Sequence, residues 1–231
     1  MTSPTVHTEG GAAAEALALI VAGTLAASIA PQAVLTLVAP ADAPAALHSL
    51  WHGFRAMASG QYRDLALYGA SHPDPRAVEA ALAKSTAACG LYAVLGARAA
   101  GVTGEALTQW ERFGAAVGYA IEVSLDCRDA LDFAFRDIAA GARTLPIALA
   151  LQPGAHGDPE KLRRALAAAP HDPSARHHAR DAIAASGSVA ACGTLVEAAV
   201  ARAERILAAL APPHRSTLQT FIGGLSWLRR A

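Results

Sequence analysis

The chain has 231 residues, of which 53% are hydrophobic, 5% aromatic and 16% charged, with a mean hydropathy of +0.29. Roughly a quarter of the residues are alanine, a strong helix former and a weak strand former, which excludes an all-β fold. The high apolar content and the zero net charge exclude a disordered chain, and the balance of 19 basic and 19 acidic residues gives no sign of nucleic-acid binding.

The longest uncharged segment, Ala16–Ala41, is long enough to span a membrane. However, Pro31 interrupts it, and the first basic residue of the chain, Arg55, lies well beyond it. The basic flanks that signal peptides and membrane anchors favour are therefore missing. We predict buried core helices in this segment and no transmembrane segment.

Helix start and stop signals divide the rest of the chain. Asp74 followed by Pro75 predicts a helix start, and Gly101 predicts its end. Thr103 is expected to cap the next helix, and Asp158–Pro159 predicts another start. Further helices are expected over Ala182–Leu210, with a break at Gly187 or Gly193, and after Pro212–Pro213. The sequence therefore predicts an all-α bundle of about eight to ten helices in a single domain, residues 1–231.

The three cysteines, Cys89, Cys127 and Cys192, are widely spaced. This spacing supports neither a disulfide framework nor a zinc cluster, so we expect a reducing compartment, the cytoplasm. We also expect Cys127, between two aspartates, to pack as a small apolar residue.

Polar residues that could bind a ligand or take part in a reaction fall into a few short patterns. Gln61 and Asp64 are three positions apart on one helix face, and Lys84 is one of only two lysines in the chain. Asp126 and Asp129 are also three positions apart, with Asp132 one step further. Paired carboxylates facing a bundle interior suit a hard cation such as Mg²⁺.

The order of these patterns resembles the trans-isoprenyl diphosphate synthase family. The matching stretches, in the family's notation, are Pro4–His7 (P-T-x-H), Gly60–Asp64 (G-Q-x-x-D), Lys84–Ser85 (K-T), Gly118–Asp129 (G-x-x-F-Q-x-x-D-D-x-x-D) and Asp137–Pro146 (D-x-x-x-G-K-x-T-x-P). Five motifs in the right order predict the family's fold: an all-α, isoprenoid-synthase-type bundle around a central apolar cavity.

The resemblance implies an enzyme that ionises an allylic prenyl diphosphate with Mg²⁺ and transfers the prenyl group, in isoprenoid biosynthesis. It implies catalytic roles for Lys84, Asp126 and Asp129. The substrate diphosphate would be bound by Gln61, Asp64, Lys84, Ser85 and Arg143. The metal ligands would be Asp126, Asp129 and Glu122. A homodimer, or a heteromer with another synthase chain, is the implied assembly.

The chain also departs from the family pattern. The first aspartate motif would lie before Pro4, so we expect it and the helices before it to be missing. In the second motif Leu125 replaces an aspartate and Glu122 replaces the glutamine, while Ala142 replaces the lysine of G-K, with Arg143 adjacent as a substitute cation. An Asp–Arg pair formed with Arg128 could satisfy the remaining carboxylates without a metal.

Two functional alternatives to a synthase therefore stay open. The chain could be a non-catalytic regulatory or partner subunit of a complete prenyl diphosphate synthase, or a terpene-synthase-like cyclase on the same fold. His48 and His52, at positions i and i+4, offer two nitrogen ligands, but no third ligand follows at a suitable spacing, so we expect no metal there.

Overall fold

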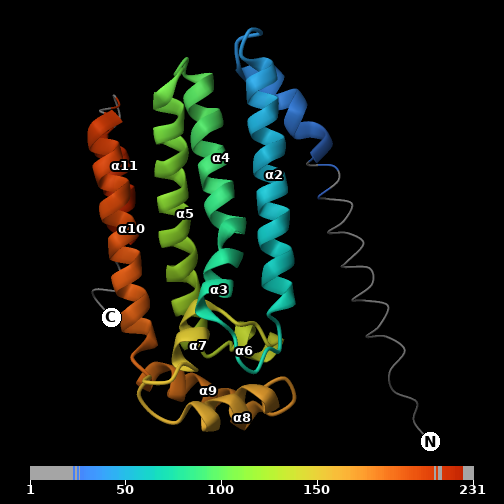
Figure 1. The fold of residues 1–231 in the computed structure, drawn as a ribbon, viewed down its shortest axis with the longest axis vertical. Coiled ribbons are helices and arrows are strands. Elements are labelled where there is room, and N and C mark those ends of the chain that lie inside the picture. The colour runs from blue at the N-terminus through green and yellow to red at the C-terminus, as the bar shows by residue number, and fades with distance from the viewer. Residues whose placement is uncertain (1–22, 24, 26, 211, 213–214, 226–231) are drawn as a thin grey trace, which may run out of the picture.

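The structure is a computed structural model that describes residues 23, 25, 27–210, 212 and 215–225. Over these ranges the regular secondary structure is helical, with no β-strand (Figure 1), which confirms the predicted all-α fold. A first helix, Ala27–Leu37, precedes the labelled ones. These are α2 (Ala43–Ala66), α3 (Pro75–Ala81), α4 (Ala83–Ala99), α5 (Glu105–Leu131), α6 (Arg136–Ala140), α7 (Leu145–Ala150), α8 (Pro159–Ala168), α9 (Pro173–Ala185), α10 (Ser188–Leu210) and α11 (Arg215–Gly224).

Three long helices, α2, α4 and α5, lie side by side, with α4 in the middle and α10 beyond α5 (Figure 1). Glycines let these helices approach closely. A Cβ atom at Gly60 of α2 would lie 2.3 Å from the backbone N of Lys84. On α5, a Cβ at Gly114 would lie 2.2 Å from the carbonyl oxygen of Cys89. The small residues that dominate the composition therefore serve close helix packing.

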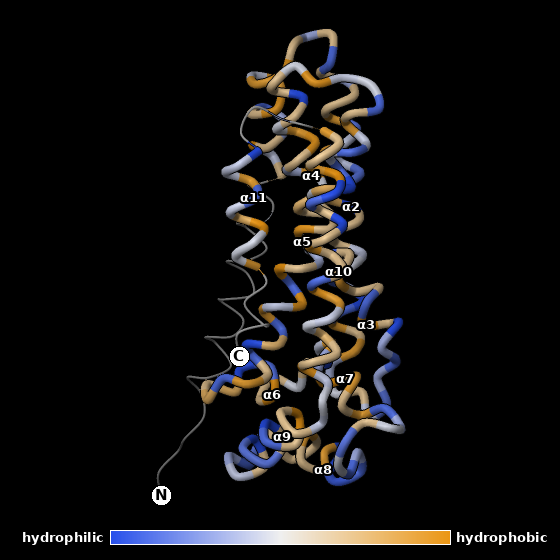
Figure 2. Tube along the Cα trace, turned by 90° about the vertical axis from the view of Figure 1, so that its left-hand side faces the viewer, coloured by the Kyte–Doolittle hydropathy of each residue, from blue (hydrophilic) through white to orange (hydrophobic). Residues whose placement is uncertain are grey.

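Three hydrophobic clusters support this layer among the described residues, and the smallest packs the helix Ala27–Leu37 against α2. The main core joins α5 to α10 through side chains such as Phe113, Val123, Val196 and Leu207. The second lies at the end where α8 and α9 close the molecule, and hydrophilic residues mark the outer turns of these two helices (Figure 2). Its buried members include Phe135, Ile138, Ile147, Leu162, Leu166 and Ile183.

Most predicted helix boundaries are confirmed. The side chain of Asp74 accepts a hydrogen bond from the backbone N–H of Arg76, and Asp158 caps α8 in the same way. Gly187, with φ = 82°, separates α9 from α10, whereas Gly193 lies within α10. The structure adds one cap that was not predicted, Asp172, which opens α9.

Two predicted helix boundaries are wrong. The helix expected from Asp74 to Gly101 is interrupted at Leu82, because α3 packs Val78 and Leu82 into the main core while α4 packs between α2 and α5. The N-cap of α5 is Gly104 and not Thr103. Gly104 has φ = 65°, a left-handed conformation that glycine adopts readily.

The uncharged segment Ala16–Ala41 is not fully buried, contrary to our prediction. In its described part, the helix Ala27–Leu37 packs one face, with Val34, against α2. Ile29, Leu35 and Leu37 are 52%, 49% and 67% exposed. The helix is apolar on both faces, but the described residues cover only one. The P-T-x-H stretch, Pro4–His7, lies outside the described residues.

One helical run among the described residues, Pro75–Ala99, has the length and hydropathy of a membrane-crossing helix, and the bent pair of α9 and α10 would add a second. This run comprises α3 and α4, and its α4 part packs between α2 and α5. Core helices of globular proteins meet the same criteria, so this is weak evidence for a span.

Candidate active site

Acidic side chains from three helices, α2, α5 and α6, gather around a cavity of about 200 Å³ at one end of the α2–α4–α5 layer. Asp64 comes from the end of α2, and Lys84 comes from the first turn of α4. On α5, Glu122, Asp126 and Asp129 stand at positions i, i+4 and i+7. The helical period of 3.6 residues therefore places them on one face of the helix. The carboxylates on the lining are Asp64, Glu122, Asp126, Asp129 and Asp137. We call this the acidic cavity.

Lys84 bridges two of these carboxylates. Its Nζ atom lies 2.7 Å from Oδ2 of Asp64 on α2 and 3.2 Å from Oε1 of Glu122 on α5. Burial by itself lowers the pKa of Lys84, but the hydrogen bond that Lys84 donates to Asp64 and the charge of Glu122 outweigh it and raise the pKa to about 12. Lys84 is therefore charged at neutral pH and links all three long helices.

Ser85, the next residue, faces the same network. Its hydroxyl donates a hydrogen bond of 2.8 Å to Oε2 of Glu122, so both oxygens of Glu122 are engaged. Ser85 and Gln61 do not line the acidic cavity. They line an adjoining cavity of about 410 Å³ on the other side of Lys84, together with apolar residues such as Met57 and Ala88.

Asp126 is the most strongly perturbed carboxyl group of the cavity. Burial and, next, the negative charge of Glu122 raise its pKa to about 8, against a partial compensation by the backbone N–H of Leu145, 3.4 Å away. Burial also raises the pKa of Asp137, and the charge of Asp129 adds to this effect. The cavity therefore holds more negative charge than its one lysine balances.

Asp129 has positive partners instead. Nε of Arg128 lies 3.2 Å and Nη2 of Arg136 lies 3.6 Å from its Oδ1 atom. The Asp–Arg pairing considered from the sequence is thus present for Asp129, while neither arginine pairs with Asp126 in the described part of the chain. Asp132 is the C-cap residue of α5 and does not line the cavity.

The structure does not bring Arg143 to the acidic cavity. Arg143 is 5% exposed, and its guanidinium donates to the carbonyl oxygens of Ala70, Gly141 and Ala142 at 2.7–3.0 Å. Its neighbour Ala142 lines the cavity in its place. Arg143 thus donates hydrogen bonds to three loop carbonyl oxygens. Its side chain does not reach the acidic cavity, where a cation that replaces the lysine of the G-K motif would lie.

Three polar residues that line the cavity were not among the predicted site residues: Tyr68, Asp137 and Thr144. Asp137 and Thr144 stand in the D-x-x-x-G-K-x-T-x-P match, so the sequence held a signal for them. Tyr68 follows Asp64 by four positions, but the helix α2 ends at Ala66, so helical spacing did not apply. The hydroxyl of Thr144 is buried without a hydrogen-bond partner in the described structure.

The donors of the cavity suit Mg²⁺ by their chemistry, since carboxylate oxygens are the ligands it prefers. However, no three His, Cys, Asp or Glu side chains within the described ranges are placed to hold a metal ion by themselves. Mg²⁺ commonly binds through one or two carboxylates while phosphate oxygens and water complete its shell. The residues present fit that kind of site and not an all-protein metal site.

Solved structures with the same helix arrangement are prenyl synthases. A polyprenyl synthetase from Streptomyces coelicolor A3(2) matches with a TM-score of 0.75 and 19% identity, over 90% of this chain and 64% of its own. A geranylgeranyl pyrophosphate synthetase from Pyrococcus horikoshii Ot3 matches with a TM-score of 0.68 and 20% identity, over 82% and 60% of the two chains.

A third solved structure is a polyprenyl synthase from Caulobacter crescentus CB15, complexed with calcium and isoprenyl diphosphate. It matches with a TM-score of 0.64 and 24% identity, over 80% of this chain and 59% of its own. The chain therefore spans about three fifths of the length of these proteins. No protein-family model and no curated protein matches the sequence.

At these identities, the likeness establishes the fold. The chain has the all-α fold of the polyprenyl and geranylgeranyl diphosphate synthases, as the five motifs predicted.

Proposed function

We propose that this protein is a divergent member of the isoprenyl diphosphate synthases that binds an allylic prenyl diphosphate with Mg²⁺ at the acidic cavity and acts as a prenyltransferase. The observation that carries this proposal is the position of Lys84. It lies between the carboxylates of α2 and α5, at the end of the bundle where α6 and α7 close the cavity.

The charge of the cavity supports the need for a metal ion. Arg128 and Arg136 pair with Asp129. Among the described residues, Lys84 is the one basic residue on the lining that faces the other four carboxyl groups, so a diphosphate entering alone would be repelled. Asp126 and Asp129, with Glu122 beside them, are the residues that would hold Mg²⁺. The bound ion would supply charge neutralisation of the diphosphate leaving group.

The remaining residues fit the binding of a substrate with a charged head and an apolar tail. Lys84 is within reach of both cavities, so its ammonium can exchange a carboxylate partner for a diphosphate oxygen. Gln61 and Ser85 line the adjoining cavity, whose apolar residues would contact the hydrocarbon.

A second candidate function is a partner subunit of a complete synthase. The exposed apolar residues of the helix Ala27–Leu37 favour it, because a face of this kind is usually covered by protein. A homodimer formed through the same face would cover these apolar residues equally well. A terpene-synthase-like cyclase remains the third candidate, and it differs from the first in its product and in needing no second substrate.

The decisive assay is Mg²⁺-dependent release of diphosphate from geranyl, farnesyl or geranylgeranyl diphosphate, with and without isopentenyl diphosphate. We expect release by the wild-type protein and a loss of about 100-fold or more in the Asp126→Asn and Lys84→Gln variants. Glu204→Gln, an exposed carboxylate on α10, is the matched control and should keep full activity.

Product analysis separates the three candidates. Chain elongation requires isopentenyl diphosphate, whereas cyclisation releases diphosphate from the allylic substrate alone. If the pure protein releases no diphosphate but changes the products of a co-purified synthase, the subunit function holds and the catalytic one is excluded.

A further inference from the structure

A second polar cavity lies at the opposite end of the α2–α4–α5 layer. Its volume is about 350 Å³, and it is lined by the start of α2, the end of α4 and the start of α5. None of its lining residues lines the acidic cavity. We call it the distal cavity. The function proposed above gives it no role.

The distal cavity carries charges of both signs that do not pair with each other. Arg98 of α4 forms no hydrogen bond and no ion pair with the described residues, and its Nε atom is buried without a partner. Asp42, the N-cap of α2, and Glu111 of α5 also lack a side-chain partner in this part of the chain. A buried guanidinium nitrogen without a partner is uncommon, because losing hydration without a new hydrogen bond is unfavourable.

The surroundings of Arg98 favour an anion. The 27-residue helix α5 begins at the cavity, and its N-cap, Gly104, supplies no side-chain cap for the first backbone N–H groups. Thr103 and Thr108 add hydroxyl groups to the same lining. The partial positive charge of the helix start and the guanidinium act in the same direction.

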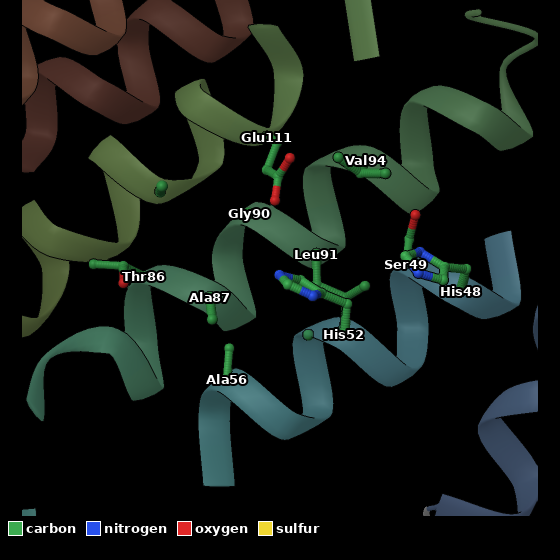
Figure 3. Close-up of a pocket in the computed structure, with 12 residues that line it drawn as sticks. His48, Ser49, His52, Ala56, Thr86, Ala87, Gly90, Leu91, Val94 and Glu111 are labelled. Carbon is green, nitrogen blue, oxygen red and sulfur yellow. The ribbon is translucent and has the colours of Figure 1, made fainter. Parts of the chain in front are cut away.

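Glu111 adds a carboxylate to the cavity, which would attract a positively charged group. It also lines a neighbouring groove of about 360 Å³, in which His48, Ser49 and His52 of α2 face Glu111 of α5 across α4 (Figure 3). The distal cavity and this groove adjoin, because Ser49, Val94 and Glu111 line both. An anion on Arg98 could carry a short chain that extends towards the carboxylate of Glu111.

We propose that the distal cavity binds a small zwitterion, with a phosphate or carboxylate group on Arg98 and an ammonium group on Glu111. A ligand with both charges complements the two unpaired groups, while an anion alone meets the carboxylates of Asp42 and Glu111, and a cation alone meets Arg98. This site is independent of the proposed prenyl diphosphate binding.

The test is isothermal titration of the full chain in buffer with EDTA, which removes the metal ions that the acidic cavity would need. Phosphoethanolamine and 4-aminobutyrate are the zwitterionic probes, and inorganic phosphate, butyrate and ethanolamine each carry charge of one sign only. We expect at least one zwitterion to bind about tenfold more tightly than every probe with charge of one sign. If neither zwitterion bound more tightly than these probes, the proposal would be overturned.

Variants assign the two charges. Arg98→Gln and Glu111→Gln should each weaken zwitterion binding about tenfold, whereas Arg98→Lys, which keeps the charge, should retain most of it. Asp126→Asn in the acidic cavity should leave this binding unchanged, which separates the two sites. Circular dichroism checks that each variant is folded, and unchanged binding in both folded Gln variants would contradict the assignment.

Discussion

The two ends of the α2–α4–α5 layer differ in whether the basic residue of α4 forms ion pairs with its neighbours. At one end Lys84 joins Asp64 and Glu122 in a partly buried network, and Ser85 completes it. At the other end Arg98, on the same helix, stays unpaired beside Asp42 and Glu111. The same three helices therefore build one end in which the lysine is satisfied within the protein and one end in which the arginine is not.

Close helix contact accounts for the pairing of Lys84. At the acidic end Gly60 allows α2 to touch the backbone of α4 at Lys84, which brings carboxylates from both neighbours within reach of one ammonium group. Near the distal end Arg98, Asp42 and Glu111 line one cavity without forming ion pairs with one another. The two basic residues Lys84 and Arg98 of α4 thus differ in whether the described protein supplies a partner.

The largest expected effect comes from breaking the close contact at the acidic end. Gly60→Ala would place a Cβ 2.3 Å from the backbone N of Lys84, and backbone atoms cannot move aside as a flexible side chain can. We expect a loss of about 3 kcal/mol in the free energy of unfolding, measured by urea denaturation.

The matched control is Gly96→Ala on α4, where no atom lies within 4 Å of the new Cβ. This variant should gain about 0.5–1 kcal/mol, because alanine favours a helix interior over glycine. If both variants gained stability equally, α2 and α4 would not be in the close contact described.

The second prediction compares the two basic residues of α4 by one substitution. Lys84→Met leaves Asp64 and Glu122 as partly buried carboxylates without their cation, and should cost about 1–3 kcal/mol of unfolding free energy. Arg98→Met removes a group without a partner in the described structure, and should change stability by less than about 0.5 kcal/mol. Thermal unfolding of the two variants measures this difference, and equal losses would contradict it.

The third prediction concerns the pH dependence of stability. Burial and the charge of Glu122 raise the pKa of Asp126 to about 8 in the folded protein, whereas an exposed aspartate in the unfolded chain titrates near 3.9. Between these values the folded state holds a proton that the unfolded state has released. The contribution of Asp126 is therefore most favourable below about pH 4 and falls as the pH rises to about 8.

Asp126→Asn removes this dependence. Relative to wild type, the variant should gain on the order of 2 kcal/mol as the pH rises from about 5 to 8, after allowance for solvent screening. Urea denaturation across this range measures it, with Glu204→Gln as the control that should follow the wild-type curve. Parallel curves for Asp126→Asn and wild type would show that Asp126 titrates normally. For the same reason, Mg²⁺ binding by wild type should strengthen as the pH rises towards 8.

The smallest expected effect tests a single hydrogen bond. Ser85→Ala removes the 2.8 Å bond to Glu122 and should cost about 1 kcal/mol of unfolding free energy. Thr86→Ala, the next position on α4, removes a hydroxyl without a described hydrogen bond and should change stability by less than about 0.5 kcal/mol. Guanidinium denaturation of both variants gives the comparison, and a Thr86 variant that lost more than the Ser85 variant would reverse the expected order.

Much of the fold could be predicted from the sequence because its signals are local. The caps Asp74 and Asp158 bond to backbone N–H groups only two or three residues away, so a few residues contain the whole interaction. The same holds for the shared face of Glu122, Asp126 and Asp129, which the helical period fixes.

The candidate site was predicted less completely. Asp64, Lys84, Glu122, Asp126 and Asp129 meet in one cavity, while Gln61 and Ser85 line the adjoining one. Arg143 is directed elsewhere because, in the turn before α7, the direction of a side chain depends on the carbonyl groups that loops from distant positions present to it. No periodicity governs such a turn.

By itself, the sequence determined that the protein is helical, where most helices start and which acidic residues share a face of α5, because each of these properties arises within one or two helical turns. Only the tertiary structure decided that Lys84 bridges α2 and α5, that the helix breaks at Leu82, that Ala27–Leu37 exposes an apolar face and that Arg98 is left unpaired. Each of those outcomes depends on the distance between helices far apart in the chain, and the packing of small residues at their crossings sets that distance.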